Sequence, residues 1–431
     1  MKCNLCILKT YIKKIFVLLI INLIIICFFS YNNIFKKYLN LIPIDDKREN
    51  TFNSIVYKLK KNEKRRIPKY ILLMDFYPNP YCNDLNAYYI FKYYQKKKIN
   101  NAYYVINIKS DLYIYLKKEN KTQNLIPINS NDNIYEKLYE YILNSKIIIN
   151  SYVDRDIQRL ISNVSFLNFL YLTHAIGYFK KRIISIELKG VEISKRNIIV
   201  SSPYEYKYYK EHLNYSDNYM YRAGLPRYDR FKNLKRNYSE KQCILITFTY
   251  RRYSNKIYKK SLFKKNLEKL LSDKTLIYFL KNKNIDLIYI PHHFDLFRKR
   301  PFNPKKFPYI KYTKQALLGH YIEHCSLFIT DFSSISFDFM FLNKPALFYL
   351  IDVKDKIKFV ERQYMQYDKK NNIYFGNVFY NQRLLIERII YYANKKFKIN
   401  KQLEKKYKSL FYYKTNITEK IIDIINKIIK N

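Results

Sequence analysis

The densest group of residues that could bind a phosphate follows a short apolar strand in the C-terminal half of the sequence. Leu327 to Ile329 reads as a buried strand, and a Thr-Asp-Phe-Ser-Ser turn leads from it into an apolar helix. Backbone N–H groups at a helix start have no partner inside the helix, so anions bind there. Ser333 and Ser334 can cap this helix and add hydroxyl donors, and Asp331 is expected to orient the turn. The pattern predicts a phosphate-binding turn, although capping alone would use the same residue types.

The helix after this turn carries one further charged residue. Asp338 lies one turn into it, either as a supporting partner of the phosphate-binding residues or as an exposed helix residue. Asn343-Lys344-Pro345 ends the helix, and Ala346 to Ile351 reads as the next buried strand. This order places the polar turn at the carboxyl end of a buried parallel strand, where ligands of α/β sheets gather.

Two histidines follow other predicted strands. His174 comes after Asn168 to Leu172 and is expected on a loop that faces a cleft. An imidazole with a pKa of about 6.5 accepts a proton at neutral pH, so His174 is a candidate general base. The alternative is a loop histidine whose ring bonds to backbone. Metal binding by His292 with His293 is disfavoured, because adjacent residues on a strand point to opposite faces.

Two arginines lie near expected turns. Arg251, in Thr249-Tyr250-Arg251, follows a predicted strand and can hold a phosphate with two parallel hydrogen bonds. In a chain with 80 Lys and Arg, a surface arginine is the alternative. Arg227 lies in a Gly-Leu-Pro-Arg-Tyr-Asp segment, and in a chain with only five glycines Gly224 beside Pro226 indicates a required turn. The segment is interpreted as structural, around a hinge, with Arg227 as a further candidate ligand.

Five segments in a fixed order resemble one enzyme family. Each segment is weak alone, but together they cover roughly residues 168 to 380, about half the chain. The segments are THAIGYFKK at 173–181, AGLPRYDRF at 223–231, TFTYRR at 247–252, IPHH at 290–293 and the strand, turn and helix at 327–352. Their order is similar to that in the CDP-glycerol glycerophosphotransferases, which build teichoic-acid-like polyol-phosphate polymers.

The resemblance implies a reaction and assigns roles. The donor would be CDP-glycerol or another CDP-polyol, and the acceptor a hydroxyl group of a lipid-linked or glycan molecule. His174 would deprotonate that hydroxyl, and CMP would leave. The groups that would stabilise the pyrophosphate charge are Ser333, Ser334, Arg251 and His292.

The family motifs fit this chain with some departures. Thr249 and Arg251 match a Thr-aromatic-Arg turn, and His292 matches a Pro-His motif, where it would contact phosphate or protonate the departing CMP. Thr173 stands where the family has Trp, and Ala175 stands where it has Gly. These departures put the acceptor geometry in question.

No metal and no cofactor are expected. The sequence has no Walker loop and no evident magnesium site. The six cysteines are scattered, and only Cys3-x-x-Cys6 is closely spaced, so neither a disulfide framework nor a zinc site is indicated. A reducing, cytoplasmic setting for the catalytic part is expected.

Strand-like and helix-like stretches alternate from about residue 68, which predicts an α/β fold. Two doubly wound Rossmann-like domains with a cleft between them are expected, in agreement with the family's GT-B-like architecture. The expected parts are an N-terminal membrane anchor or signal-anchor at 1–40, an acceptor-side domain at 68–235, a CDP-polyol-binding domain at 241–400 and a C-terminal helix at 401–431. The expected strands are Tyr70 to Asp75, Tyr103 to Ile108, Ile147 to Asn150, Phe166 to Leu172, Ile198 to Ser201, Cys243 to Phe248, Asp286 to Ile290, Leu327 to Ile329 and Ala346 to Leu350.

An apolar segment near the N-terminus indicates a membrane association. Ile15 to Phe29 is interrupted only by Asn22, and Lys13-Lys14 and Lys36-Lys37 flank it. Lysines on both sides leave its orientation open. The family's cytoplasmic nucleotide donor implies a cell-membrane protein with cytoplasmic catalytic domains.

The formal net charge of +45 would ordinarily suggest nucleic acid or anionic lipid as a partner. Lys, Asn, Ile, Tyr and Phe are abundant while Gly, Pro and Trp are scarce, as in an AT-rich coding sequence. There is no compact basic stripe and no nucleic-acid motif. The excess lysine is therefore interpreted as solvated surface, part of which would serve docking on a membrane surface, and no nucleic-acid partner is expected.

Two other function classes stay open. A GT-B glycosyltransferase that uses a nucleotide sugar would share the fold and the cleft, and donor identity would separate the two. A catalytically inactive nucleotide-binding relative is the other class, favoured if the altered THAIG turn has lost its function. The polyol, the acceptor and the number of units added are not fixed by the sequence.

Overall fold

The computed structural model describes residues 46–75, 86–129, 134–151, 160, 163–173, 175–176, 196–232, 234, 241–251, 254–292, 295, 303–313, 317–352 and 376–430. The chain divides into two units, residues 1–58 and 59–431. Of the first unit, the structure describes part of the helix α2 (Asp46–Lys61), in which Phe52 and Ile55 are buried. The predicted membrane segment at 1–40 lies outside the described residues. Within the described ranges, no helix is both long and apolar enough to cross a membrane.

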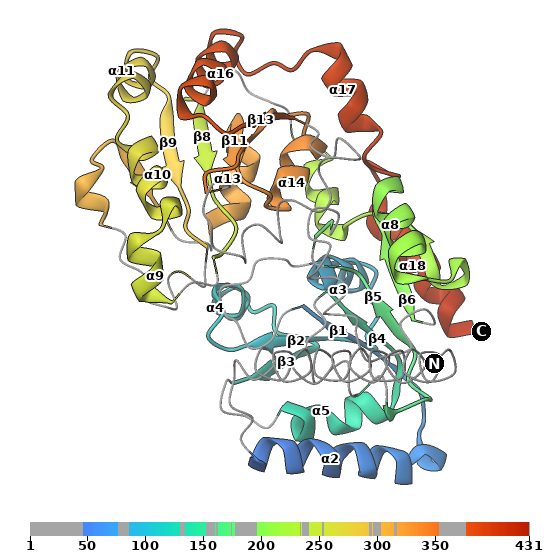
Figure 1. Ribbon diagram of the computed structural model, residues 1–431. Coiled ribbons are helices and arrows are strands. Elements are labelled where there is room, and N and C mark those ends of the chain that lie inside the picture. The colour runs from blue at the N-terminus through green and yellow to red at the C-terminus, as the bar shows by residue number, and fades with distance from the viewer. Residues whose placement is uncertain are drawn as a thin grey trace, which may run out of the picture. The chain divides into compact units, whose positions relative to one another are not determined.

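The first sheet of the second unit has seven parallel strands in the order β3-β2-β1-β4-β5-β6-β7. Its central strands contain buried apolar runs, at 71–74 in β1 and 147–149 in β4, because helices cover both faces, with α3 and α5 on opposite sides in Figure 1. The strands are β1 (Tyr70–Met74), β2 (Ala102–Asn107), β3 (Leu125–Ile128), β4 (Ser145–Asn150), β5 (Phe169–Tyr171), β6 (Asn197–Val200) and β7 (Met220–Arg222).

The second sheet has six parallel strands in the order β10-β9-β8-β11-β12-β13. In both sheets the strand order reverses beside the first strand, between β1 and β4 and between β8 and β11, as in doubly wound nucleotide-binding folds. The strands are β8 (Cys243–Ile246), β9 (Asp286–Tyr289), β10 (Ile310–Tyr312), β11 (Leu327–Thr330), β12 (Ala346–Tyr349) and β13 (Asn377–Phe379).

Helices connect the strands, and several begin at a capping side chain. Ser110, Asp273 and Asn381 each accept a hydrogen bond from a backbone N–H of the first turn, which satisfies a donor that has no partner within the helix. The α-helices are α3 (Asn86–Lys96), α4 (Asp111–Lys118), α5 (Ile134–Leu143), α8 (Pro203–Leu213), α9 (Asn255–Lys260), α10 (Leu262–Leu271), α11 (Lys274–Asn282), α13 (Leu318–His324), α14 (Ile335–Phe341), α16 (Gln382–Asn394), α17 (Lys401–Lys408) and α18 (Ile417–Lys430). The 3₁₀ helices are η1 (Glu63–Arg65), η3 (Asp217–Tyr219), η4 (Pro226–Phe231) and η5 (Pro304–Lys306).

The C-terminal stretch expected as one helix contains two, which pack on different parts of the fold. α17 contacts α14 beside the second sheet, whereas α18 contacts η4, α3 and β4 of the first. Ile417, Ile421 and Ile425 recur every four residues on one face of α18 and are fully buried. The carboxylate of Asp229 in η4 accepts the N–H groups of Ile417 and Thr418 at 3.0 and 2.7 Å and so fixes the start of α18. The chain therefore returns to the first sheet at its end.

The α/β fold with two parallel sheets is confirmed, and the nine predicted strands are all present with small differences at their ends. The strands that were not predicted are β3, β7, β10 and β13. These are the outermost strands of the two sheets. Each has three or four residues and is only partly buried. Pro127 lies in β3, Arg222 in β7, Lys311 in β10 and Asn377 in β13, so none of the four strands has a long apolar run.

Cys243 and Cys325 form a disulfide that the sequence did not indicate. Cys243 begins β8, Cys325 lies two residues before β11, and their Cα atoms are 4.6 Å apart. The pairing of β8 with β11 brings the two cysteines together across 82 residues of sequence. The cysteine spacing could not show this, because it depends on strand order. Cys3, Cys6, Cys27 and Cys82 lie outside the described residues.

Gly376, just before β13, is a position where the packing requires glycine. A Cβ atom there would lie far inside van der Waals contact with the backbone carbonyl oxygen of Ala346 in β12. We expect Gly376→Ala to lower the free energy of unfolding by about 1–3 kcal/mol, because backbone must move to admit the methyl group. The change can be measured by urea titration with circular dichroism. Gly319→Ala in α13 is the control, since its nearest neighbours are the end atoms of the Arg230 side chain, which can move. Equal losses in the two variants would contradict the prediction.

Candidate active site

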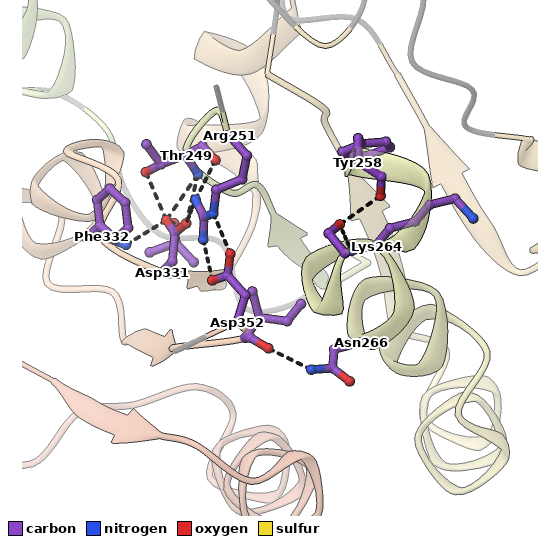
Figure 2. A network of polar contacts seen from close by, with 11 residues as sticks. Thr249, Arg251, Tyr258, Lys264, Asn266, Asp331, Phe332 and Asp352 are labelled. Carbon is purple, nitrogen blue, oxygen red and sulfur yellow. Dashed lines mark hydrogen bonds and ion pairs between the residues drawn. The ribbon is translucent and has the colours of Figure 1, made fainter. Parts of the chain in front are cut away.

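Three loops of the second sheet meet at its carboxyl edge, beside the point where the strand order reverses. They follow β8, β11 and β12 and bring together Thr249, Arg251, Asp331 and Asp352, as Figure 2 shows. All four residues are buried. Ligands of open α/β sheets bind at this kind of position, so the network lies where a site is expected.

Asp331, directly after β11, fastens the loop after β8 to its own loop. Its carboxylate accepts hydrogen bonds from the N–H of Thr249 at 3.0 Å and from the Thr249 hydroxyl at 2.9 Å. It also accepts the N–H of Phe332 at 2.6 Å and Nη1 of Arg251 at 2.7 Å. The predicted role of Asp331 in orienting the turn agrees with this geometry.

Arg251 is 1% exposed, and its guanidinium binds two carboxylates. Nε and Nη2 donate to the two oxygens of Asp352 at 2.7 and 2.8 Å, and Nη1 donates to Asp331 and to the carbonyl oxygen of Thr249. The aromatic rings of Phe263 and Phe332 lie 4.8 and 5.3 Å from its guanidinium carbon. The parallel pair of donors predicted to hold phosphate is therefore directed at Asp352.

Arg251 lies between two carboxylates, and all three groups are buried. In the described structure its guanidinium holds three loop ends together. Its predicted role as a phosphate clamp stays a prediction.

Asp352 is a residue of this network that sequence reasoning missed. It follows the apolar run of β12 in the same way that Asp331 follows β11, and that position was the available signal. Its backbone is fixed by Asn266 of α10, whose Nδ2 donates to the carbonyl oxygen of Ile351 at 2.7 Å (Figure 2).

The two serines of the turn differ in their surroundings. The Ser333 side chain is buried, and its hydroxyl accepts the N–H of Ile335 at 3.4 Å, a long capping bond. Ser334 is partly exposed, and within the described residues its side chain forms no capping bond to α14. The Ser334 hydroxyl therefore takes no part in capping α14 within the described residues, and its predicted binding of phosphate stays a prediction.

His292 lies next to the same loops. Its ring packs on that of Tyr250, with centroids 5.6 Å apart, and Tyr250 stands between Thr249 and Arg251. His292 is partly exposed, and its predicted contact with phosphate stays a prediction. His293 lies outside the described residues. Among the residues that are described, no three His, Cys, Asp or Glu side chains come together to hold a metal ion.

Arg227 and Asp338 form a buried ion pair between η4 and α14. Nε and Nη2 of Arg227 donate to the two carboxylate oxygens of Asp338 at 3.0 and 3.1 Å. The side chains are 6% and 1% exposed, so the interpretation of Asp338 as an exposed helix residue is wrong. Each neutralises the other. Their predicted role as substrate ligands stays a prediction.

His174, the candidate base, lies outside the described residues, but the residues beside it are described. Thr173 is buried and has a φ of 59°, the left-handed region that β-branched residues rarely adopt. Ala175 and Ile176 are also buried. The loop after β5 thus begins with an unusual backbone conformation directly before the predicted base.

Asp75 occupies the corresponding edge of the first sheet, between β1 and β4. Its carboxylate accepts the N–H groups of Ala87 and Tyr88 at the start of α3 and the hydroxyls of Ser151 and Tyr104, at 2.6–3.0 Å. Burial raises the pKa of Asp75 to about 6, and the hydrogen bonds from Ser151, Ala87, Tyr104 and Tyr88 oppose that rise. The position that an anion would take at the start of α3 is filled by the protein's own carboxylate.

Residues 63–427 match the family model described as CDP-Glycerol:Poly(glycerophosphate) glycerophosphotransferase. The chain belongs to this family. This chain is 28% identical over 348 residues to the minor teichoic acid biosynthesis protein GgaB of Bacillus subtilis (strain 168). The matched stretch covers 75% of this chain and 36% of GgaB. It thus spans about a third of that relative's length.

Two solved structures share the fold of this chain. The wall teichoic acid polymerase TagF superposes with a TM-score of 0.60 at 15% identity, over 88% of this chain and 98% of that one. A UDP-N-acetylglucosamine 2-epimerase from Listeria monocytogenes gives a TM-score of 0.51 at 10% identity, over 84% and 96%. At these identities the likeness shows the fold alone, two parallel α/β sheets arranged as in the GT-B-like TagF.

Removal of the guanidinium from the network should destabilise this family member strongly. Arg251→Ala leaves Asp331 and Asp352 buried without a cation, so we expect the free energy of unfolding to fall by about 3–5 kcal/mol. Chemical denaturation measures the change. Arg383→Ala in α16 is the matched control, because Arg383 also pairs with a carboxylate but is 87% exposed, and it should change stability little. A loss in Arg251→Ala no larger than that of the control would show that the network does not hold the loops.

The buried carboxyl of Asp75 should give stability a measurable pH dependence. A pKa of about 6 in the folded chain against 3.8 for the free group means that ionisation opposes folding, so stability is lost as the pH rises from about 4 to about 6. At about 1.4 kcal/mol per pKa unit the loss is about 3 kcal/mol. We expect Asp75→Asn to remove this slope in urea titrations at pH 4 and pH 7.

The control for this experiment should show the opposite pH dependence of stability. The hydrogen bond from Lys210 lowers the pKa of the exposed Asp217, so Asp217→Asn should remove stability that is present at neutral pH and lost as the pH falls. If the free energy of unfolding changed equally between pH 4 and pH 7 in wild type and in Asp75→Asn, the Asp75 carboxyl would not titrate between these pH values.

Proposed function

We propose that this chain transfers glycerol phosphate, or a related polyol phosphate, from CDP-glycerol to a hydroxyl of a membrane-associated acceptor and releases CMP. The transfer would serve the synthesis of a teichoic-acid-like or capsular polymer of the cell surface. The observation that carries the proposal is the family match from residue 63 to 427, which spans both sheets. The names of GgaB and TagF point to the same chemistry, and one TagF structure is of a variant with CDPG.

The donor is assigned to the carboxyl edge of the second sheet. The hydroxyls of Ser333 and Ser334 and the ring of His292 are the groups there that can donate to a pyrophosphate. The buried contacts of Arg251 with Asp331 and Asp352 keep the loops in place, so little reorganisation is needed as charge develops on the leaving group.

The acceptor is assigned to the first sheet, where His174 follows β5. His174 takes the proton from the acceptor hydroxyl as its oxygen attacks the phosphorus bonded to glycerol. The bond from that phosphorus to the bridging oxygen breaks, and CMP leaves with the electron pair. Positioning and charge stabilisation supply most of the rate enhancement in such transfers.

The cellular setting is part of the proposal. The apolar segment Ile15 to Phe29 supports an anchored protein at the cell membrane, and the net charge of +45 supports contact with an anionic lipid surface. A nucleotide donor places the catalytic sheets on the cytoplasmic side. The acceptor would then be a lipid-linked or glycan molecule at that surface.

A nucleotide-sugar glycosyltransferase is the second candidate. The epimerase of similar fold acts, by its name, on a UDP-sugar, and this supports a sugar nucleotide as donor. The replacement of the usual residues by Thr173 and Ala175 beside the predicted base supports an inactive relative. The donor and the turnover separate these classes from the proposal.

The test is CMP release by detergent-solubilised protein from CDP-glycerol and CDP-ribitol, with a membrane-lipid extract as acceptor. We expect acceptor-dependent release that falls about 10²–10⁴-fold in His174→Ala, because the base is lost, while donor binding is kept. His292→Ala should also weaken donor binding. His320→Ala, an exposed histidine of α13, is the control and should match wild type.

Each contrary result points to a different function or mechanism. Turnover of UDP-sugars in place of CDP-polyols would establish the glycosyltransferase. CDP-glycerol binding without turnover, in an extract that supports an active member of the family, would establish an inactive relative. Full activity in His174→Ala would remove His174 from the mechanism.

A further inference from the structure

The side chain of Asn86, at the start of α3, connects three parts of the chain. It is fully buried, and its Nδ2 donates to the carbonyl oxygen of Thr173 at 2.9 Å. Its Oδ1 accepts the backbone N–H of Arg227 in η4 at 3.2 Å. One amide thus lies between the end of β5 and the segment that leads out of the first sheet.

Thr173 has an unusual backbone conformation at this contact. A φ of 59° costs a β-branched residue about 1–3 kcal/mol and persists only where the surroundings impose it. Its hydroxyl is buried and has no hydrogen-bond partner among the described residues, so the threonine side chain does not fix the turn. The carbonyl that Asn86 holds belongs to the peptide bond that joins Thr173 to His174.

The support behind Asn86 is rigid. The next two N–H groups of α3, on Ala87 and Tyr88, bond to Asp75 at the end of β1. Ser151, at the end of β4, donates to the same carboxylate and accepts the N–H of Ala87. The start of α3 is therefore fastened to two strand ends, and Asn86 extends this fastening to a third.

Arg227 carries the connection to the second sheet. Its backbone N–H is held by Asn86, and its guanidinium binds Asp338 in α14, the helix that follows Ser333 and Ser334. The contacts are buried, where a lost partner leaves a polar group unsatisfied. Hydrogen bonds and the side chain of Arg227 thus connect the carbonyl of Thr173, directly before the predicted base, to the helix that follows the predicted donor turn.

We propose that Asn86 is a positioning residue of the transfer reaction. It fixes the orientation of the peptide bond between Thr173 and His174, and thereby the position of the predicted base relative to the predicted donor turn. The inference rests on the proposed function, with His174 as base. Asn86 touches no substrate in this account. It acts by holding Thr173 in the left-handed conformation and by sharing its amide with Arg227.

The test compares Asn86→Asp with wild type. The substitution keeps an acceptor for the Arg227 N–H, removes the donor to Thr173 and adds a carboxyl at a buried position. We expect kcat of acceptor-dependent CMP release to fall about 100-fold, as for a misplacement of about 1 Å, with the KM for CDP-glycerol unchanged. Hydrogen exchange of the peptide from Leu172 to Ile176 should become faster, and this readout does not require activity.

A control and a rescue separate positioning from general damage. Asn168→Asp removes a side-chain bond of the same kind at an exposed position, from Nδ2 to the carbonyl oxygen of Lys146 at 3.1 Å, near the amino end of β5, and should leave kcat and the exchange of this peptide unchanged. Thr173→Gly places a residue that adopts positive φ without strain. In combination with Asn86→Ala, which avoids a buried charge, it should recover part of the kcat lost in Asn86→Ala alone.

The outcomes are distinct. Wild-type kcat in Asn86→Asp, or a lower kcat with unchanged exchange of the peptide, would overturn the inference. Equal effects in Asn168→Asp would overturn it as well. If wild type releases no CMP while Asn86→Asp still speeds exchange, the proposed function fails and the contact stands.

Discussion

The candidate site depends on a guanidinium that is withdrawn from water between two carboxylates. Burial of these charges costs several kcal/mol for each ion, and only close, paired geometry offsets it. Asp331 and Asp352 meet this condition with contacts of 2.7–2.8 Å, and the backbone of the loop after β8 is bonded into the same group. Three loops from strands far apart in the sequence are thereby held in one arrangement. Such an arrangement is useful to a site that stabilises developing charge, because fixed dipoles do so without rearranging.

The two sheets use the same topological position differently. In the second sheet, the acid at the strand end is neutralised by Arg251, and serines and a histidine lie beside it. In the first sheet, the hydrogen-bond partners of Asp75 within the described ranges include no cation, and its carboxylate accepts the N–H groups at the start of α3. An added anion would meet that carboxylate there, whereas Ser333, Ser334 and His292 lie beside the network of the second sheet. The proposed assignment of the nucleotide to the second sheet rests on these hydrogen-bond donors.

The sequence was sufficient for the fold class and for the buried strands, because a strand covered on both faces must be apolar along its length. It was insufficient for the outer strands β3, β7, β10 and β13, which are short and half-buried and whose pairing decides their structure. For the site, the position after a strand identified Asp331 and His292. The partners of Arg251 and Asp338 could not be predicted, because ion pairs between distant residues leave no local pattern. The same holds for Asn86 and for the bond between Cys243 and Cys325.

The return of α18 to the first sheet has a consequence for synthesis of the chain on the ribosome. The described strands of the first sheet precede residue 223, but the isoleucines that cover η4, α3 and β4 belong to α18, about 200 residues further along the chain. Domains generally fold as they emerge, N-terminal first. Here the first sheet would keep an uncovered apolar surface until α18 has left the ribosome. Emergence of α18, and not completion of either sheet alone, is then the event that closes the fold.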